Sequence, residues 1–572
     1  MNLGCPADRL PAAPRRRRIS AQLLVLVIAT AGLAACTSVP DERPNLRIAT
    51  EHASAQAVAE VPATAGTSLR LAGELTRTGG LAPPFRDALS RFYADRGYRP
   101  LWFPDGRATA ATQALLTVLR DAEDEGLDPA DYAPEALDSD CTLASTIDVA
   151  DCELRFSNAL LRYAHDVRFG VLAAAEANPG WHVPRPQDDA ELLTAVVATQ
   201  DLAALLRDLP PPHTGYQRLR GALAELRRAA EAERPLIPPG PALHPGNRGP
   251  RVRALRERLG VEPSPSSADV PVDVPVDVYD APLQSAVAAF QAGHGLYSDG
   301  VVGERTLVAL NQPPAQGIAQ VRLNMERWRW LPRDPGPRHV IVNLAGFELT
   351  LTQPDVAPLT LRAIVGRPDR STPVMHSQID ELVLNPPWTV PRRLAVEDML
   401  PQLRRDPAAM QKKGIHILTR RDGVLSEVDP AAVDWQSHHA QNFPFVLRQA
   451  PGPANSLGRI KFDMHNPLDI YLHDTPARDL FDKTQRTFSS GCIRVDQPLR
   501  LAARLLGGDA DSAAAYLQQR IDSGRTVSVP LQQAVPVYLV YQTAWVDDDG
   551  NLQLRDDVYG RDVQLRDRFA FP

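Results

Sequence analysis

The chain has 572 residues, of which 44% are hydrophobic and 23% are charged, and its formal net charge is −7. This length is enough for about three or four domains, each with its own core. Only one apolar run, over residues 23–33, is long and nearly uninterrupted, which excludes a polytopic membrane protein. The negative charge argues against a protein that binds nucleic acid through bulk positive charge.

The first part of the chain has the features of an export signal. Arginines at positions 15–18 precede the apolar run, and the sequence Leu-Ala-Ala-Cys follows and ends at Cys36. A basic region, a short apolar region and small residues before a cleavage point are typical of such signals. The ending resembles a bacterial lipoprotein signal, which implies a signal peptide over 1–35 and lipid attachment to Cys36. An uncleaved anchor helix is the alternative.

The lipoprotein resemblance also implies where the protein resides. A lipid-anchored protein of this kind faces the periplasm and contacts the membrane through its N-terminal lipid. Thr37, rather than Asp, follows the cysteine, which implies sorting to the inner face of the outer membrane. Residues 36–80 are rich in Ala, Thr and Pro without a sustained period, so we predict a flexible tether there.

Residues 81–240 have a helical pattern and are expected to form a helical scaffold domain. Phe85, Leu89 and Phe92 recur at the spacing of one helix face. Cys141 and Cys152 lie close together in the sequence, and an oxidising compartment favours a disulfide between them. Two free thiols are the alternative for this pair.

Residues 244–312 are expected to form a small three-helix domain. The pattern Gly-x-x-Gly-Pro-x-Val-x-x-Leu-x-x-x-Leu begins at Gly246, Phe290-Gln291 follows, and Asp-Gly-x-x-Gly-x-x-Thr begins at Asp299. These motifs resemble the peptidoglycan-binding domain of cell-wall enzymes. The chain departs from that pattern over residues 261–279, an extra segment that we expect to form an exposed loop. A helical spacer without a ligand is the alternative.

Residues 313–337 are expected to be a connector that belongs to the scaffold, and 338–572 a mainly β domain. Short strand-like runs separated by Pro and Gly turns support the β prediction. A segment over about 393–450, helical at its start, interrupts them and is expected to cap a cleft. It contains Trp435 and the adjacent His438 and His439. No partner Cys, Asp or Glu stands at zinc-site spacing, so we predict solvated histidines and no metal.

The last cysteine, Cys492, has no predicted partner and lies 19 residues after His473. A thiol attacks carbonyl groups as the thiolate, and a neighbouring histidine can take its proton. Gly491 permits a tight turn, so the amides of Gly491 and Cys492 are candidates for an oxyanion hole. Arg494 is a candidate for bidentate binding of a substrate carboxylate. The alternatives are a small buried cysteine, a structural histidine and an arginine paired with a nearby Asp.

These residues resemble the signature of the L,D-transpeptidase (YkuD-type) catalytic domain. That signature has a His, about fifteen further residues, and then Ser-His-Gly-Cys-x-Asn/Arg; here it runs from His473 to Ser489-Ser490-Gly491-Cys492-Ile493-Arg494. The resemblance covers roughly 320–560, and the region before it is similar to the scaffold of large periplasmic members. Ser490 stands where many members have His, and its role is left open.

The resemblance implies a two-step acyl transfer without a cofactor. Cys492 attacks the L-centre carbonyl of meso-diaminopimelate in a tetrapeptide stem and releases D-Ala, while His473 carries the proton. The amine of a second stem then attacks the thioester and forms a 3-3 cross-link. Ser489 and Ser490 are candidates for substrate binding, and Asp474 is a possible orienting residue for His473.

Several other functions remain open at this stage. A Ser-x-x-Lys site is excluded because none of the four lysines has Ser three residues before it, and no His-Glu-x-x-His motif occurs. Water as acceptor would make the protein an L,D-carboxypeptidase, and a protein acceptor would make it an attachment enzyme. A non-catalytic tether between membrane and wall is the alternative from another class. Rapid alkylation of Cys492 near neutral pH would argue against the tether. No oligomeric state is predicted.

Overall fold

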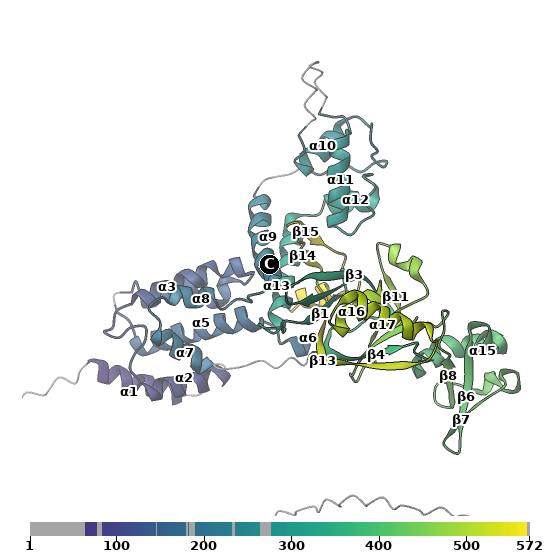
Figure 1. The fold of residues 1–572 in the computed structure, drawn as a ribbon. Coiled ribbons are helices and arrows are strands. Elements are labelled where there is room, and N and C mark those ends of the chain that lie inside the picture. The colour runs from purple at the N-terminus through teal and green to yellow at the C-terminus, as the bar shows by residue number, and fades with distance from the viewer. Residues whose placement is uncertain are drawn as a thin grey trace, which may run out of the picture. The chain divides into compact units, whose positions relative to one another are not determined.

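The computed structural model describes residues 63–76, 83–144, 146–178, 181, 189–231, 235–262 and 276–568 (Figure 1). The predicted signal peptide and Cys36 lie outside these residues, and so do the predicted outer-membrane anchor and most of the tether. Within the described part of the chain, no helix is both long and apolar enough to cross a membrane.

The first domain is a helical bundle. Its helices are α1 (Ala63–Thr76), α2 (Pro83–Asp95), α3 (Ala110–Arg120), α4 (Pro134–Cys141), α5 (Val149–Phe169), α6 (Ala174–Ala177), α7 (Asp189–Ala198), α8 (Leu202–Arg207) and α9 (Thr214–Ala230). A disulfide between Cys141 and Cys152 joins the end of α4 to α5. The buried Glu153 of α5 accepts hydrogen bonds from the amides of Leu101, Trp102 and Phe103 at 2.7–2.8 Å. Together, the disulfide and these hydrogen bonds fix the chain around α5.

The structure differs from the predicted tether in its last part. Residues Ala63–Thr76 form α1 rather than a flexible segment. Leu71 and Leu75, four residues apart, fall on one helix face and are buried in the core of the helical bundle. The tether prediction missed this pair because Ala, Thr and Gly around it dilute the helical period.

A small three-helix domain follows, made of α10 (Pro250–Leu259), α11 (Ala281–Gly293) and α12 (Glu304–Leu310). Val252, Leu283 and Val287 are fully buried in its core. The Gln291 side chain accepts a hydrogen bond from the Gly300 amide at 2.8 Å and donates to the Val301 carbonyl at 2.9 Å. Gln291 therefore fixes the glycine turn before α12. Most of the predicted exposed loop, residues 263–275, lies outside the described residues.

The last domain is built on a nine-stranded sheet whose pairing returns on itself. The strand order is β11-β3-β12-β10-β9-β4-β13-β1-β2, and β2 also pairs with β3. The strands are β1 (His339–Asn343), β2 (Glu348–Gln353), β3 (Val356–Gly366), β4 (Met375–Leu384), β9 (Ile460–Met464), β10 (Leu472–His473), β11 (Thr487–Ser489), β12 (Ile493–Val495) and β13 (Val527–Val540). Apolar side chains from these strands contribute to one shared hydrophobic core.

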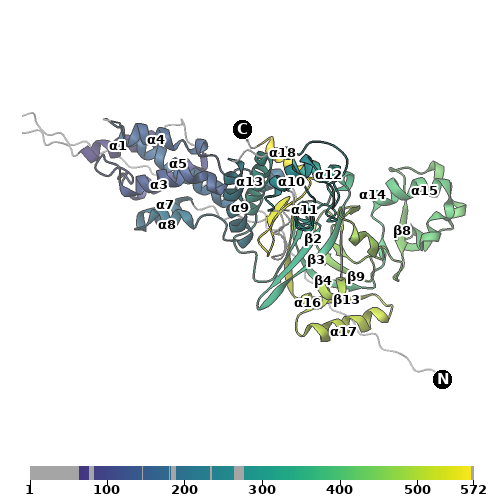
Figure 2. The ribbon, with the colours of Figure 1, turned by 90° about the horizontal axis from the view of Figure 1, so that it is seen from above.

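Helices cover this sheet and connect it to the scaffold. The helices α16 (Pro498–Leu506) and α17 (Ala510–Asp522) contact each other, and they contact β13 and β4, respectively (Figure 2). The helix α13 (Pro314–Trp330) packs against α9 and against the hairpin of β14 (Ala544–Val546) and β15 (Leu552–Leu554). A final helix, α18 (Arg561–Arg566), also contacts α13.

An inserted subdomain, here called the cap, lies between β4 and β9. It contains β5 (Trp388–Thr389), α14 (Arg392–Leu394), the π-helix η4 (Ala395–Met399), α15 (Leu400–Arg405), β6 (Ile415–Arg421), β7 (Val424–Glu427) and β8 (Phe445–Gln449). Its apolar side chains, Trp435 among them, form a core separate from that of the sheet. The cap begins a few residues before the predicted 393 because Trp388 already pairs with Gln449 of β8.

Candidate active site

The two halves of the sequence motif meet on adjacent strands of the sheet. The parallel strands β10 and β12 place His473 opposite Arg494. The Ile493 amide donates to the Tyr471 carbonyl at 3.1 Å, which places Cys492 next to Tyr471. Because side chains alternate along a strand, Tyr471, His473, Cys492 and Arg494 project to the same face. The sheet therefore assembles the predicted cysteine, histidine and arginine at one place.

The loop that carries the cysteine is fixed by short hydrogen bonds. Ser489 Oγ donates to the Cys492 carbonyl at 2.5 Å and accepts a hydrogen bond from the Gly491 amide at 3.1 Å. Thr372 Oγ1 donates to the Gly491 carbonyl at 2.7 Å. Gly491 has a φ of +124°, a conformation that favours glycine. Ser489 therefore holds the loop through the Cys492 carbonyl and the Gly491 amide.

These contacts correct the predicted oxyanion hole. The Gly491 amide is already engaged by Ser489 Oγ, so it does not point at a substrate oxygen. Among the described residues, no acceptor receives a hydrogen bond from the Cys492 amide. Only the second of the two predicted donors is therefore available in this geometry.

His473 is buried and neutral. Its Nδ1 lies 2.5 Å from the Asp474 carbonyl oxygen. Because a carbonyl can only accept, Nδ1 carries the proton and Nε2 holds a lone pair. Burial lowers the pKa of His473 to about 3, and the charges of Arg494 and Lys461 add to this effect while the bond to the Asp474 carbonyl opposes it. The side chain is therefore a neutral imidazole, ready to accept a proton on Nε2.

Asp474 was predicted as a possible orienting residue for His473, and in the structure its main-chain carbonyl, rather than its carboxylate, contacts the imidazole. The carboxylate accepts hydrogen bonds from the amides of Arg459 at 2.8 Å and Thr475 at 2.6 Å, and it pairs with Arg478. These contacts turn it away from the imidazole. Sequence adjacency did not distinguish the carbonyl from the carboxylate.

The Cys492 thiol is also neutral at rest. Its Sγ lies 3.7 Å from the Asp469 carbonyl oxygen. Burial raises the pKa of Cys492, and hydrogen bonds from Tyr471 oppose this effect. Within the described part of the chain, no hydrogen bond joins Sγ to His473. The resting pair is therefore thiol and imidazole, and a proton transfer must accompany attack on a carbonyl.

Three residues of the site were missed in the sequence. Burial and the neighbouring Cys492 raise the pKa of Tyr471, and Trp388 of the cap opposes this effect. Lys461 Nζ lies 4.6 Å from the centre of the Tyr471 ring and 3.0 Å from Asp463. Tyr471 could have been found, since it stands two residues before His473 and so shares its face of the strand.

Arg494 has no carboxylate partner among the described residues, which contradicts the alternative that it pairs with an Asp. Its Nε is buried without a hydrogen-bond acceptor. Burial lowers the pKa of Arg494, and the nearby Cys492 opposes this effect. A guanidinium with an unused donor beside Cys492 can bind a carboxylate or carbonyl oxygen.

Ser490 lies at the exposed side of the loop. Its Oγ is 3.5 Å from Nη1 of Arg370, a residue that also contacts the cap. Of the two serines predicted to bind substrate, Ser489 is buried in the loop and Ser490 alone faces outward. Of the adjacent cap histidines, His439 is exposed, whereas His438 is half-buried against Trp435 and Phe445. No group of three His, Cys, Asp or Glu in the described ranges could hold a metal ion.

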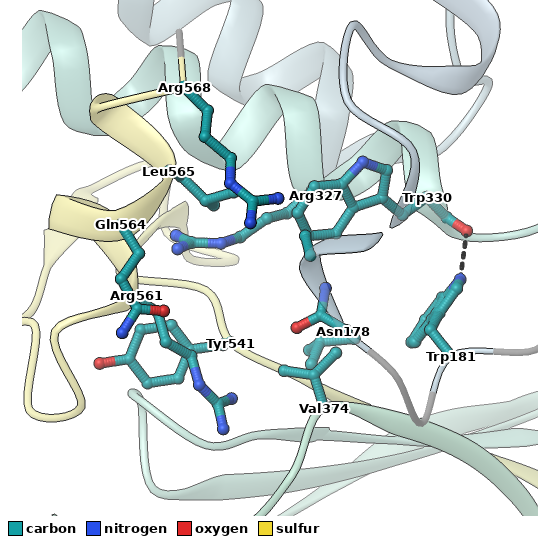
Figure 3. A pocket seen from close by; sticks show the side chains of 12 residues that line it. Asn178, Trp181, Arg327, Trp330, Val374, Tyr541, Arg561, Gln564, Leu565 and Arg568 are labelled. Carbon is teal, nitrogen blue, oxygen red and sulfur yellow. Dashed lines mark hydrogen bonds between the residues drawn. The ribbon is translucent and has the colours of Figure 1, made fainter. Parts of the chain in front are cut away.

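A separate pocket lies where the segment after α6 meets α13 and α18 (Figure 3). Its cavity measures about 80 Å³. Trp181 Nε1 donates to the Trp330 carbonyl at 3.2 Å at one wall. Arg561, which lines the pocket, donates to the Thr372 carbonyl at 2.8 Å. Since Thr372 also holds Gly491, the packing around this pocket supports the cysteine loop.

Three family models match the chain. Residues 87–223 match the "Scaffold domain", and residues 248–310 match the "Putative peptidoglycan binding domain". Residues 337–529 match the "L,D-transpeptidase catalytic domain" of the YkuD family. The last match contains every residue of the site described above.

Two known proteins are similar to the chain. A curated protein named "Putative L,D-transpeptidase", from Haemophilus influenzae, is 38% identical over 250 residues, which are 43% of this chain and 48% of that protein. The match thus spans about half the length of that relative. The solved L,D-transpeptidase from Xylanimonas cellulosilytica is 16% identical over 53% of this chain and 99% of its own, with a TM-score of 0.16, too low to support an argument. The sequence match and the family models together identify residues 337–529 as an L,D-transpeptidase catalytic domain of the YkuD family, in a chain that also carries a scaffold and a peptidoglycan-binding domain.

Proposed function

We propose that the chain is a cysteine-dependent L,D-transpeptidase that forms 3-3 cross-links in peptidoglycan. The observation that carries this proposal is the grouping of Cys492, a neutral His473 with a free Nε2, and an unpaired Arg494 on one face of the sheet. The name of the Haemophilus influenzae relative supports the same reaction class.

In the first step, Cys492 Sγ attacks the L-centre carbonyl of meso-diaminopimelate in a tetrapeptide stem. The thiol proton passes to Nε2 of His473 as the sulfur–carbon bond forms. His473 then gives this proton to the nitrogen of D-Ala, the carbon–nitrogen bond breaks, and a thioester remains. The Cys492 amide is the donor that we assign to the developing oxyanion.

In the second step, the side-chain amine of another stem attacks the thioester. The new carbon–nitrogen bond forms, the sulfur–carbon bond breaks, and His473 returns a proton from the amine to sulfur. Arg494 binds a carboxylate of the stem beside the nucleophile, since its donors have no other partner. Tyr471 lies on the same face of the sheet, beside the sulfur.

We further propose that the protein acts in the periplasm, anchored to the inner face of the outer membrane through lipid on Cys36. The three-helix domain would then hold the chain on peptidoglycan while the catalytic domain acts on stem peptides. This proposal rests on the sequence Leu-Ala-Ala-Cys and on the family match of residues 248–310.

The raised pKa of Cys492 affects the use of thiol alkylation to distinguish an enzyme from a non-catalytic tether. A raised pKa of Cys492 means slow alkylation near neutral pH even in an active enzyme. Slow labelling therefore does not favour a tether, and the reaction itself must be measured.

The experiment is incubation of the full chain, in detergent, with purified disaccharide-tetrapeptide, followed by mass spectrometry. A dimer that has lost one D-Ala, absent with Cys492→Ala, is the expected product. Tripeptide alone would make the protein an L,D-carboxypeptidase. Unchanged substrate, from protein that remains folded and binds sacculi, would refute catalysis and leave the tether.

A further inference from the structure

The cap depends on a few specific contacts for its position. Its apolar core shares no residue with the core of the sheet, so no continuous packing fixes one to the other. Trp388 of the cap lies close enough to Tyr471, which neighbours Cys492, to affect its pKa. A polar contact is made by Arg370, which follows β3 in the sheet domain.

Arg370 binds two adjacent carboxylates of the cap. Its guanidinium contacts both oxygens of Asp398, at 2.5 and 2.6 Å, and Glu397 Oε2 at 2.9 Å. The Arg370 side chain is only 7% exposed, whereas those of Asp398 and Glu397 are 38% and 45% exposed. Both acids belong to the π-helix η4, a local widening of the helix that often marks functional sites.

The same arginine is fixed to the cysteine loop. Its Nη1 also contacts Ser490 Oγ at 3.5 Å, one residue before Gly491. Its carbonyl oxygen packs so closely on Gly366 that a Cβ there would lie 2.1 Å away. Gly366 pairs with Ser489 at the start of the cysteine loop, so the Arg370 main chain is packed against a residue that neighbours this loop, while its side chain contacts the cap.

We propose that Arg370 is a positioning residue that locks the cap onto the cysteine loop through Asp398 and Glu397, and so selects an amine rather than water as the acceptor. This inference rests on the proposed transpeptidase function. A correctly placed cap excludes water from the thioester and orients the second stem. Ser490, in place of a bulkier side chain, leaves room for the guanidinium beside the loop.

The test compares Asp398→Asn with a matched control, Arg393→Gln. Asp398→Asn keeps the shape of the side chain and removes the bidentate partner of Arg370. Arg393 contacts the same Glu397, at 3.0 Å, but its side chain is 63% exposed and it does not reach the loop. Arg370→Lys, alone and combined with Asp398→Asn, completes a double-mutant cycle.

The first readout is the ratio of tripeptide to cross-linked dimer made from tetrapeptide. We expect Asp398→Asn to raise this ratio roughly fivefold or more, while alkylation of Cys492 by iodoacetamide at pH 9 stays within about twofold of the wild type. The Arg393→Gln ratio is expected to match the wild type. The double variant is expected to have a ratio of tripeptide to dimer no higher than that of Arg370→Lys alone.

The second readout does not need activity. Hydrogen exchange in residues 395–405 is expected to rise about tenfold in Asp398→Asn and to stay unchanged in Arg393→Gln. An unchanged product ratio or unchanged exchange in Asp398→Asn would overturn the inference, and so would parallel losses of alkylation and cross-linking. If the wild type makes no cross-link, the proposed function fails, and the exchange measurement alone decides whether Arg370 locks the cap.

Discussion

The buried, neutral state of His473 predicts a specific dependence of stability on pH. Its pKa falls from an ordinary value of 6.5 to about 3 in the folded protein. Between these values the unfolded chain binds a proton that the folded chain does not. Stability supplied by this group is therefore full above about pH 6.5 and is lost as the pH falls.

The size of the effect follows from the two pKa values. Each pH unit below 6.5 costs about 1.4 kcal/mol for one proton, so acidification from pH 7 to pH 5 costs about 2 kcal/mol, or roughly 30-fold in the opening equilibrium. Two half-buried histidines, His213 and His294, act in the same direction, because burial lowers the pKa of each. The contribution of His473 must therefore be measured as a difference.

His473→Asn provides that difference, because the Asn amide can still donate to the Asp474 carbonyl but does not titrate. Hydrogen exchange of the peptide covering residues 470–496, corrected for the intrinsic pH dependence, reports the local opening free energy at pH 7 and pH 5. We expect the wild type to lose about 2 kcal/mol more than the variant. A difference near zero would refute the buried neutral imidazole. A difference of opposite sign would indicate that His473 is an imidazolium paired with the Cys492 thiolate. The pKa of this imidazolium would be raised, and its charge would then stabilise the fold at low pH.

Three further predictions concern the same site. The alkylation rate of Cys492 is expected to rise about tenfold per pH unit from pH 7 to pH 9, because burial raises its pKa; a plateau near neutral pH in stopped-flow measurements would contradict this. Gly458→Ala, whose Cβ would lie 2.3 Å from the Asp474 carboxylate carbon at a φ of +62°, is expected to cost about 1–3 kcal/mol and to displace His473. Unfolding and turnover measurements check this, and wild-type values in both would refute it. Arg494→Gln is expected to raise the KM for tetrapeptide roughly tenfold or more with a smaller change in kcat, whereas equal losses in Arg494→Lys and Arg494→Gln would show that geometry matters more than charge.

The strand pattern and the motif predicted which residues meet at the candidate active site. Strand-like residues around Ile470–Leu472 predicted a strand next to His473, and β10 confirms it; the role of the unpaired Cys492 as nucleophile stays a prediction. The mainly β class of the catalytic domain and the helical class of the scaffold are confirmed by the strands and helices described above and by the family matches. The sequence could not show that β10 and β12 are neighbours, because strand order is set by contacts between distant segments.

Other features depended on interactions that leave no local pattern. The role of the Gly491 amide was predicted from its position before the cysteine, but the Ser489 hydroxyl competes for it. The Asp474 carboxylate turns to the Arg459 and Thr475 amides, which only the folded loop places within reach. Arg370 was not singled out at all, since its acidic partners lie 27 and 28 residues away in the cap.

The way in which the cap joins the sheet affects how such proteins can diverge. The strands β4 and β9 are antiparallel, Leu384 pairs with Ile460, and the Asn385 amide donates to the Arg459 carbonyl at 2.8 Å. The whole cap thus occupies the place of the short turn in an ordinary β-hairpin. It can lengthen, shrink or be exchanged without breaking a hydrogen bond of the catalytic sheet. Substrate preference can therefore evolve in the cap while the strands that hold the cysteine and histidine stay unchanged.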